Sequence, residues 1–445
     1  MFWRSDGGHA GVAKRRFAQV RLPMLIRDPI HGDIELSSVE TAVIDLPVMQ
    51  RLRGIKQLGT ANLVYPGAMH TRFDHSIGVC AVAHQIAASL RRSGLVVSTE
   101  MEEAIGVAAL LHDVTHVPFG HTLEDERRLF ARHDKGSRLT DLFAGELGSA
   151  LARLGIRDIV GSLLGLPFPE HVPRWAQDIV SGSIDADLLD YLRRDSFFAG
   201  LSQDYDDRIF QCFAEHDGRL VIRLARHGMD RPDARSEIIG VLRLRYYLTE
   251  RVYYHHTKVV AGAMISKSVE IALDHHVLNE SDLLELNDWT LLDRLARCGV
   301  PDAASLARRT LNRDLLKRGY VVSGSSVPPD QRRAWVARYH TSRIERAQAE
   351  TELAQKLGVP FADVVLYCPA LTAMKEAAVP VETSRGLEYL NDASSGTFAE
   401  INALQERYAD LWRFYVFVPA HAVERTGAIA ANMFGTPCEL ALKRR

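Results

Sequence analysis

The chain has 445 residues, more than one hydrophobic core usually holds, so we expect two domains or one large domain with an appended region. Its 54 Lys and Arg residues nearly balance 56 Asp and Glu residues, and the formal charge of −2 provides no overall field that would attract nucleic acid or an anionic membrane. The five cysteines form no C-x-x-C pair, which argues against a disulfide framework and a thiolate zinc site and suits a reducing, cytoplasmic setting.

The first part of the chain predicts a tail and then a helical core. Residues 1–22 lack a continuous apolar run, so we interpret them as a flexible tail and not as a signal peptide or membrane span. Residues 23–274 form the expected core, which opens with a tight turn or hairpin around Pro29 and Gly32. A surface loop is expected at 158–173. Apolar spacing predicts helices at 41–58, 76–92, 101–112, 122–132, 181–195 and 235–273.

One face of the expected 41–58 helix is charged. It carries Arg51, Arg53 and Lys56, and such a face is usually exposed to solvent.

Residues 275–445 predict a smaller α+β region that packs on the core and takes part in oligomer contacts. Helices are expected at 280–298 and 303–317, strands at 319–322, 364–367 and 414–418, and a helix at 397–413 packed on the small sheet. The expected fold class is therefore mostly α, an all-helical core followed by a smaller C-terminal α+β region.

The chemistry of the chain centres on His112 and Asp113, which follow an apolar, helix-compatible run. An adjacent imidazole and carboxylate can hold a divalent metal if other ligands come from elsewhere. His75, at an expected helix start, and Asp187, in an aspartate-rich helix start, are the candidates. Such a site leaves positions for water and substrate, and its metal lowers the pKa of bound water from 15.7 towards ~7. Taken singly, each histidine fits a hydrogen-bonded structural residue better than a metal ligand.

The order H…HD…D resembles that of the HD-domain metal phosphohydrolases. Further blocks are similar to one branch, the deoxynucleoside triphosphate triphosphohydrolases, which include a vertebrate enzyme with a sterile-alpha-motif domain and bacterial dGTPase-like relatives. These blocks are DPIHG at 28–32, QRLRGIKQLG at 50–59, PGA at 66–68, RFDHSIGV at 72–79 and DLLDY at 187–191. The resemblance covers residues 27–258. It implies hydrolysis of a dNTP to deoxynucleoside and inorganic triphosphate, with Mn, Fe, Zn or Mg held by His75, His112, Asp113 and Asp187.

The resemblance also implies catalytic and substrate-binding residues. His121 would protonate the departing 5′-oxygen, and Glu124 would orient the His121 ring. The implied catalytic set is His116, His121, His133, Glu124 and Asp113. The implied substrate contacts, to the triphosphate and the deoxyribose, are Gln57, Leu58, Arg72, Tyr191, Asp195, Arg245 and Tyr253. From the residues alone, the three histidines could bind phosphate without transferring a proton, Arg245 could lie on the surface, and the tyrosines could be core residues.

The chain also departs from the family pattern. Leu188 stands where the vertebrate enzyme commonly has a phosphate-binding lysine, which removes one cation from the site. Asp45, Gln50 and Arg53 match the guanine-reading residues of the family's allosteric nucleotide site. The lysine and asparagine that accompany them in the vertebrate pattern are absent near residues 24–27.

Alternative functions stay open at this point. One is hydrolysis of another nucleotide, such as a mono- or diphosphate, a cyclic nucleotide or ppGpp. Another is nucleotide sensing or single-stranded nucleic-acid binding, although the charge balance argues against a nucleic-acid partner. The expected partners are a dNTP substrate, a nucleotide activator and further copies of the chain in a dimer or tetramer, with no membrane.

Overall fold

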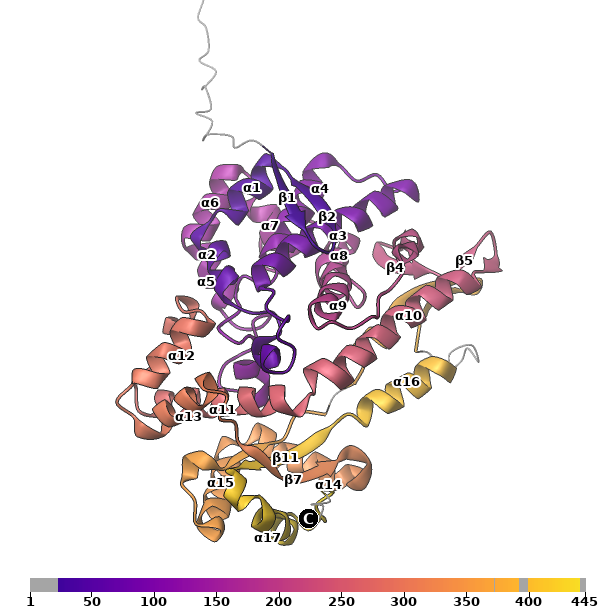
Figure 1. The fold of residues 1–445 in the computed structure, drawn as a ribbon. Helices are drawn as coiled ribbons and strands as arrows, with labels where there is room; N and C mark the ends of the chain where they lie inside the picture. The colour runs from indigo at the N-terminus through magenta and orange to yellow at the C-terminus, as the bar shows by residue number, and fades with distance from the viewer. Residues whose placement is uncertain (1–22, 372, 392–398, 441–445) are drawn as a thin grey trace, which may run out of the picture.

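The structure is a computed structural model that describes residues 23–371, 373–391 and 399–440; the expected tail at 1–22 lies outside the described residues. Helices dominate and the sheets are small, which confirms the predicted fold class (Figure 1). The helices are α1 Ser38–Ile44, α2 Pro47–Gln50, α3 Arg72–Arg92, α4 Thr99–Leu111, α5 Arg138–Ala144, α6 Glu146–Leu154, α7 Arg157–Leu163, α8 Arg174–Ser181, α9 Ala186–Phe198, α10 Pro232–Leu248, α11 His256–Asp274, α12 Asp288–Arg297, α13 Pro301–Leu311, α14 Pro329–Trp335, α15 Arg343–Leu357, α16 Ala399–Ala409 and α17 Val423–Phe434.

The strands form small sheets. The predicted N-terminal hairpin is present as antiparallel β1 and β2, which pair with each other. The strands are β1 Met24–Asp28, β2 Gly32–Leu36, β3 Phe213–His216, β4 Arg219–Arg223, β5 Ala225–Arg226, β6 Met229–Asp230, β7 Lys317–Ser323, β8 Val365–Tyr367, β9 Pro380–Thr383, β10 Gly386–Tyr389 and β11 Arg413–Val418.

Helices α3, α4 and α9 form the centre of the core, with α3 packed on both of the others. Each begins at a local capping signal. The Thr71 side chain accepts a hydrogen bond from the Asp74 N–H, and the Asp74 carboxylate accepts one from the Thr71 N–H, so α3 begins at residue 72 and not at 76. The side chains of Ser98 and Asp185 cap α4 and α9 by accepting the backbone N–H of the third residue on, Met101 and Leu188.

Several predicted helix boundaries are wrong. The expected 41–58 helix breaks after α1, and the chain continues as the short α2 and a 3-10 helix at Arg51–Gly54. Pro47 explains the break, because it cannot donate the backbone hydrogen bond that would continue α1. The expected helix at 122–132 is only a π-helix at Thr122–Glu126, and part of the expected loop at 158–173 is helix α7.

The expected 235–273 helix is two helices. A π-helix at Thr249–Tyr253 and two further residues separate α10 from α11. This break divides the core, since buried residues of α10 pack with α3, α4 and α9, whereas those of α11 pack with α12, α13 and the C-terminal sheet. Hydrophobic spacing alone is continuous across the break, so it could not place it.

The three C-terminal strands that the sequence predicts form one antiparallel sheet in the order β7-β11-β8, with α17 against β7 and α15 against β8. The helix predicted at 397–413 is α16 in its described part, and it packs on α10 instead of this sheet (Figure 1). Strands β3, β4, β9 and β10 were not predicted. They form a sheet in which β9, from the C-terminal region, runs parallel to β4 of the core, so the two regions share a sheet.

Within the described ranges, no helix combines the length and apolar character that crossing a bilayer requires. All five cysteines are free thiols.

Candidate active site

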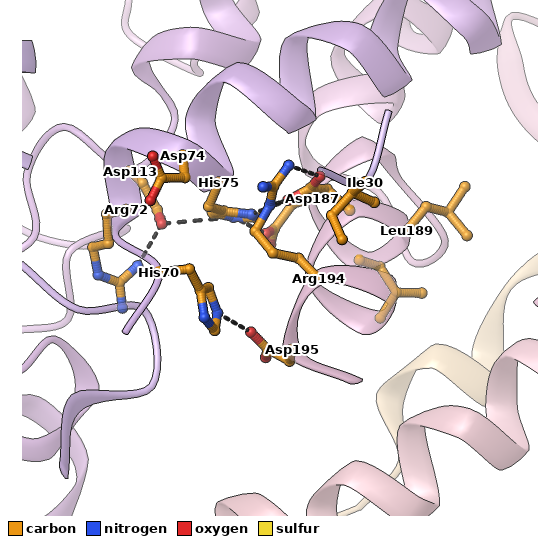
Figure 2. Close-up of polar contacts among 12 residues, drawn as sticks. Ile30, His70, Arg72, Asp74, His75, Asp113, Asp187, Leu189, Arg194 and Asp195 are labelled. Atoms are coloured by element: carbon orange, nitrogen blue, oxygen red, sulfur yellow. Dashed lines mark hydrogen bonds and ion pairs between the residues drawn. The ribbon is translucent and has the colours of Figure 1, made fainter. Parts of the chain in front are cut away.

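The four predicted metal ligands converge from three helices, and Figure 2 shows three of them, His75, Asp113 and Asp187. His75 lies in the first turn of α3, His112 and Asp113 directly follow α4, and Asp187 lies in the first turn of α9. The Nε2 atom of His75 is 2.9 Å from Asp187 Oδ1. The Nε2 atom of His112 is 3.5 Å from Asp113 Oδ1 and 3.7 Å from Asp187 Oδ1. The structure therefore brings together residues that are up to 112 positions apart in the chain.

The donor set fits a divalent metal. Donor atoms of His75, His112 and Asp113 all lie within 4.8 Å of one another. The Nδ1 atom of His112 is 2.7 Å from the Ala109 carbonyl oxygen, so it carries the proton and leaves Nε2 as an acceptor. That buried Nε2 atom has no hydrogen-bond partner among the described residues, as expected for an atom that a cation would satisfy. Imidazole nitrogens with carboxylate oxygens suit Mn, Fe or Zn.

A buried carboxylate that the sequence reading did not single out holds His75 in place. Asp190 Oδ2 is 2.7 Å from His75 Nδ1, and Asp190 also accepts hydrogen bonds from Arg194 at 2.9 Å and contacts His31 Nε2 at 2.7 Å. Burial raises the pKa of the Asp190 carboxyl, but Arg194 and the two histidines outweigh this effect and hold it well below its ordinary range. The carboxylate thus fixes the His75 tautomer and directs Nε2 to the metal position. The i, i+3, i+7 spacing of Asp187, Asp190 and Arg194, which places them on one helical face, was the available signal.

Two carboxylates beside His75 favour its protonated form. Burial lowers its pKa, but hydrogen bonds to Asp187 and Asp190 raise the pKa of His75 to about 10. A metal would therefore take the place of a proton that lies between His75 and Asp187.

The predicted catalytic histidines form a cluster beside this centre. The rings of His116 and His133 stack at 3.8 Å, and the His121 ring lies 4.9 Å from His116 and 5.0 Å from His133. Glu124 Oε2 is 3.4 Å from His121 Nδ1 and 3.3 Å from His133 Nδ1. Arg138 donates to the other oxygen of Glu124 at 3.1 Å, so this carboxylate is held in position from behind.

The pKa values of two histidines in this cluster are lowered. Burial lowers the pKa of His116 well below its ordinary value, and Arg72 adds to the effect, which favours the neutral ring. Loss of solvent around the ring also lowers the pKa of His121, with further contributions from His133 and Arg72, whereas the contact with Glu124 raises it. The His121 side chain is nevertheless 46% exposed and open to a ligand. An anionic ligand beside it would raise its pKa towards neutral pH.

Buried polar contacts hold the turn at residues 114–121, which carries His116 and His121. Arg51, interpreted from the sequence as solvent-exposed, donates to the carbonyl oxygens of Val114 at 3.3 Å and His116 at 2.6 Å. Asp288, which is fully buried, accepts the Phe119 N–H at 2.7 Å and pairs with Lys56 Nζ at 2.8 Å. Phe119 has a φ of 60°, a strained value for a residue with a side chain, so this hydrogen bond secures a backbone shape that would otherwise relax.

The predicted sugar-binding residues form a second cluster. Asp195 Oδ1 is 2.7 Å from His70 Nε2, and its Oδ2 accepts a hydrogen bond from the Tyr253 hydroxyl at 2.7 Å. The Arg245 guanidinium lies 5.4 Å from the ring centre of Tyr191 and 5.3 Å from that of Tyr253, and it donates to Glu376 at 3.2 Å. Arg245 is thus held among aromatic rings, and its side chain is 21% exposed.

The remaining predicted substrate contacts have different settings. Arg72 pairs with Asp113, and a β-carbon at Gly120 would lie 2.4 Å from Arg72 Nη2, so only glycine leaves room for the guanidinium. Gln57 has a buried Oε1 atom with no hydrogen-bond partner in the described part of the chain. The Leu58 side chain is 5% exposed and packs in the hydrophobic core, which limits it to a structural or backbone role.

The three predicted allosteric residues lie together. Asp45, Gln50 and Arg53 line a cavity of about 490 Å³ beside β1 and the start of α3. Arg53 lies 3.6 Å from the ring centre of Phe73 and donates to Gln50 Oε1 at 2.8 Å.

Residues 72–195 match the HD domain family, and residues 239–444 match the family described as the HD associated region. Together with the site geometry, these matches define the class of the protein: the chain contains an HD domain followed by an HD associated region.

Individual relatives are similar to the chain over different lengths. An uncharacterised protein of Methanocaldococcus jannaschii is 28% identical over 90% of this chain and 80% of its own length. The human deoxynucleoside triphosphate triphosphohydrolase SAMHD1 is 30% identical over 59% of this chain, and the match spans only 47% of the human enzyme. The crystal structure of a phosphohydrolase from Bacteroides thetaiotaomicron has the same fold, with a TM-score of 0.67, 23% identity, and coverage of 89% of this chain and 99% of the other.

Proposed function

We propose that this protein hydrolyses deoxynucleoside triphosphates to deoxynucleoside and inorganic triphosphate. The observation that carries the proposal is the convergence of His75, His112, Asp113 and Asp187 on one point, flanked by a histidine cluster and by the Asp195–Tyr253 pair. The four ligand residues suit a metal, the histidine cluster suits phosphate, and the Asp195–Tyr253 pair suits a sugar hydroxyl. The named activity of the similar vertebrate enzyme agrees with this assignment.

The residues divide the work as follows. When bound, the metal supplies charge neutralisation at a phosphate oxygen and lowers the pKa of water. Arg72 and Arg245 hold the triphosphate, and Asp195 and Tyr253 accept and donate hydrogen bonds at the sugar. As water forms a bond to the α-phosphorus, the bond to the 5′-oxygen breaks, and His121 gives that oxygen its proton. The proton lost by the water returns to His121 through solvent, which completes the cycle.

The test is a product assay by ion exchange on manganese-loaded protein, with each of the four dNTPs, GTP and ATP as substrate. Wild type is expected to release tripolyphosphate and deoxynucleoside, and Asp187→Ala is expected to lose this activity. Asp302→Ala removes an exposed carboxylate of α13 and serves as the matched control. Absence of tripolyphosphate with every dNTP would overturn the proposal.

One observation favours an alternative within the same family. Leu188 is 3% exposed and packs in the core, so the position after Asp187 offers no cation to a triphosphate. Hydrolysis of another nucleotide, such as a mono- or diphosphate, a cyclic nucleotide or ppGpp, would then be the reaction. Release of orthophosphate or pyrophosphate, with tripolyphosphate absent, would identify this alternative.

We propose further that nucleotide occupies the cavity lined by Asp45, Gln50 and Arg53, and that the protein works as a cytoplasmic homo-oligomer, a dimer or tetramer. The cavity volume and its mixed carboxylate, amide and guanidinium lining support a nucleotide base as the ligand. Multi-angle light scattering with and without GTP tests the oligomer, and calorimetric titration with GTP tests the cavity. A monomer in both conditions would exclude the oligomer, and an Arg53→Ala variant with unchanged GTP binding would exclude this cavity.

A further inference from the structure

Helices α1, α3 and α4 enclose a second group of metal-ligating side chains, outside the active site. Cys80 Sγ lies 3.4 Å from Glu40 Oε1, and His84 Nε2 lies 2.7 Å from the same oxygen. The three donor atoms are all within 4.8 Å of one another. We propose that Glu40, Cys80 and His84 bind a zinc-like divalent ion.

The backbone presents these donors to a common point. Cys80 and His84 are four residues apart on α3 and therefore lie on one helical face. Glu40 uses its other oxygen, Oε2, to accept the Ser37 N–H at 2.8 Å in the capping box of α1. Its Oε1 is thereby directed at Cys80 and His84. Glu40 is 1% exposed and Cys80 is fully buried, whereas the His84 side chain is 30% exposed and provides the path of entry for an ion.

Helix α4 leaves room for the site and supports it. A β-carbon at Gly106 would lie 2.0 Å from Glu40 Oε1 and 2.8 Å from His84 Nε2, so glycine is the residue that keeps this space open. One turn earlier on α4, Glu102 Oε1 is 3.7 Å from His84 Nδ1. A carboxylate on that side of the ring favours a proton on Nδ1 and leaves Nε2 to face the ion, as in many histidine metal sites.

The donor types select the ion. A thiolate, an imidazole and a carboxylate suit zinc, with the fourth position of the tetrahedron filled by water at the exposed edge of His84. Ordinary zinc bond lengths place a sulfur and an oxygen ligand about 3.5 Å apart, which matches the 3.4 Å between Cys80 and Glu40. The His84–Glu40 contact opens by roughly 0.6 Å to admit the ion. Binding releases the thiol proton of Cys80 and the proton shared by Glu40 and His84.

The absence of a C-x-x-C pair excludes sites with paired thiolates, and it does not bear on a site with one. Because the ligands come from α1 and α3 and pack against α4, a bound ion would fix the packing of the two helices that carry His75 and His112. Its role is therefore structural, separate from the reaction.

Cobalt is the probe that separates this site from the active site. The active-site ligands include no sulfur, so a near-ultraviolet thiolate-to-cobalt charge-transfer band reports only on a cysteine site. Wild-type protein titrated with Co²⁺ is expected to show the band, and Zn²⁺ is expected to abolish it. Absence of the band in folded wild-type protein would overturn the proposal.

Variants assign the band to these residues. Cys80→Ser and His84→Gln are expected to lose it together with one equivalent of zinc per chain, measured by atomic emission. His84→Gln keeps the test open if Cys80→Ser fails to fold, because His84 is partly exposed. Cys212→Ser and Asp187→Ala are the controls and are expected to keep the band. Loss of the band in Cys212→Ser, or its retention in folded His84→Gln, would contradict the assignment.

Discussion

Gly78→Ala tests whether the buried Asp190–Arg194 pair holds His75, a proposed metal ligand. Alanine in a helix interior is ordinarily more stable than glycine by about 0.5–1 kcal/mol. At Gly78, however, the added β-carbon would lie 1.9 Å from Asp190 Oδ1 and 2.2 Å from Arg194 Nη2, both of which belong to fully buried side chains. The ion pair must therefore move away from α3, and Asp190 must release His75.

The magnitude follows from these contacts. Disrupting a buried ion pair costs about 3–5 kcal/mol, and the helix-propensity gain offsets part of this, so we expect the free energy of unfolding to fall by about 2–4 kcal/mol. The affinity for Mn²⁺ is expected to fall about 10–100-fold, because Asp190 orients the His75 ring. Urea unfolding of the metal-free protein measures the first quantity, and calorimetric titration with Mn²⁺ measures the second.

Gly240→Ala is the matched control. Gly240 is also within a helix, α10, but a β-carbon there would have no atom within 4 Å. We expect the free energy of unfolding of this variant to rise by about 0.5–1 kcal/mol and its affinity for Mn²⁺ to equal that of wild type. If Gly78→Ala behaves like Gly240→Ala in both assays, the argument that Asp190 and Arg194 position His75 is refuted.

Three further predictions concern buried polar residues: two lie at the active site, and the third is Glu350 of α15, which pairs with Arg127 and Lys267. Asp288→Asn is expected to lower kcat about 10²-fold by releasing the strained turn at Phe119; an unchanged kcat in a folded variant would exclude this role. The pKa of His121 is lowered from 6.5, and the contact with Glu124 opposes this lowering. Glu124→Gln is therefore expected to shift the alkaline limb of the kcat/KM profile to lower pH. A shift to higher pH would be inconsistent with His121 as the group that protonates the 5′-oxygen. Burial opposes ionisation of Glu350, but neighbouring cations lower its pKa from 4.5 to about 2, so its stabilising contribution is present above pH 4.5 and is lost towards pH 2. Over this pH range, the free energy of unfolding of wild type is expected to fall by about 3 kcal/mol more than that of Glu350→Gln, as measured by circular dichroism. An equal fall in the two proteins would contradict this prediction.

Local signals in the sequence determined the helices that carry the proposed metal ligands. The spacing of apolar residues predicts α4 and α9, and the adjacent His112 and Asp113 identify the chemistry from residue types alone. The start of α3 was also encoded locally, in the capping pair Thr71 and Asp74. Such signals act over one or two helical turns, which is why reading along the chain can find them.

Contacts between distant segments were decided only by the tertiary structure. Arg51 belonged to a charged face that the sequence assigned to solvent, but the break at Pro47 turns it towards the carbonyl oxygens of the active-site turn. The parallel pairing of β4 with β9 joins segments about 160 residues apart, and Asp288 reaches Phe119 across 169 positions. The charge and hydrophobicity of a residue indicate which interactions it can make. The partner of a buried polar group depends on how whole helices pack, because that packing decides which hydrogen-bonding groups lie within reach.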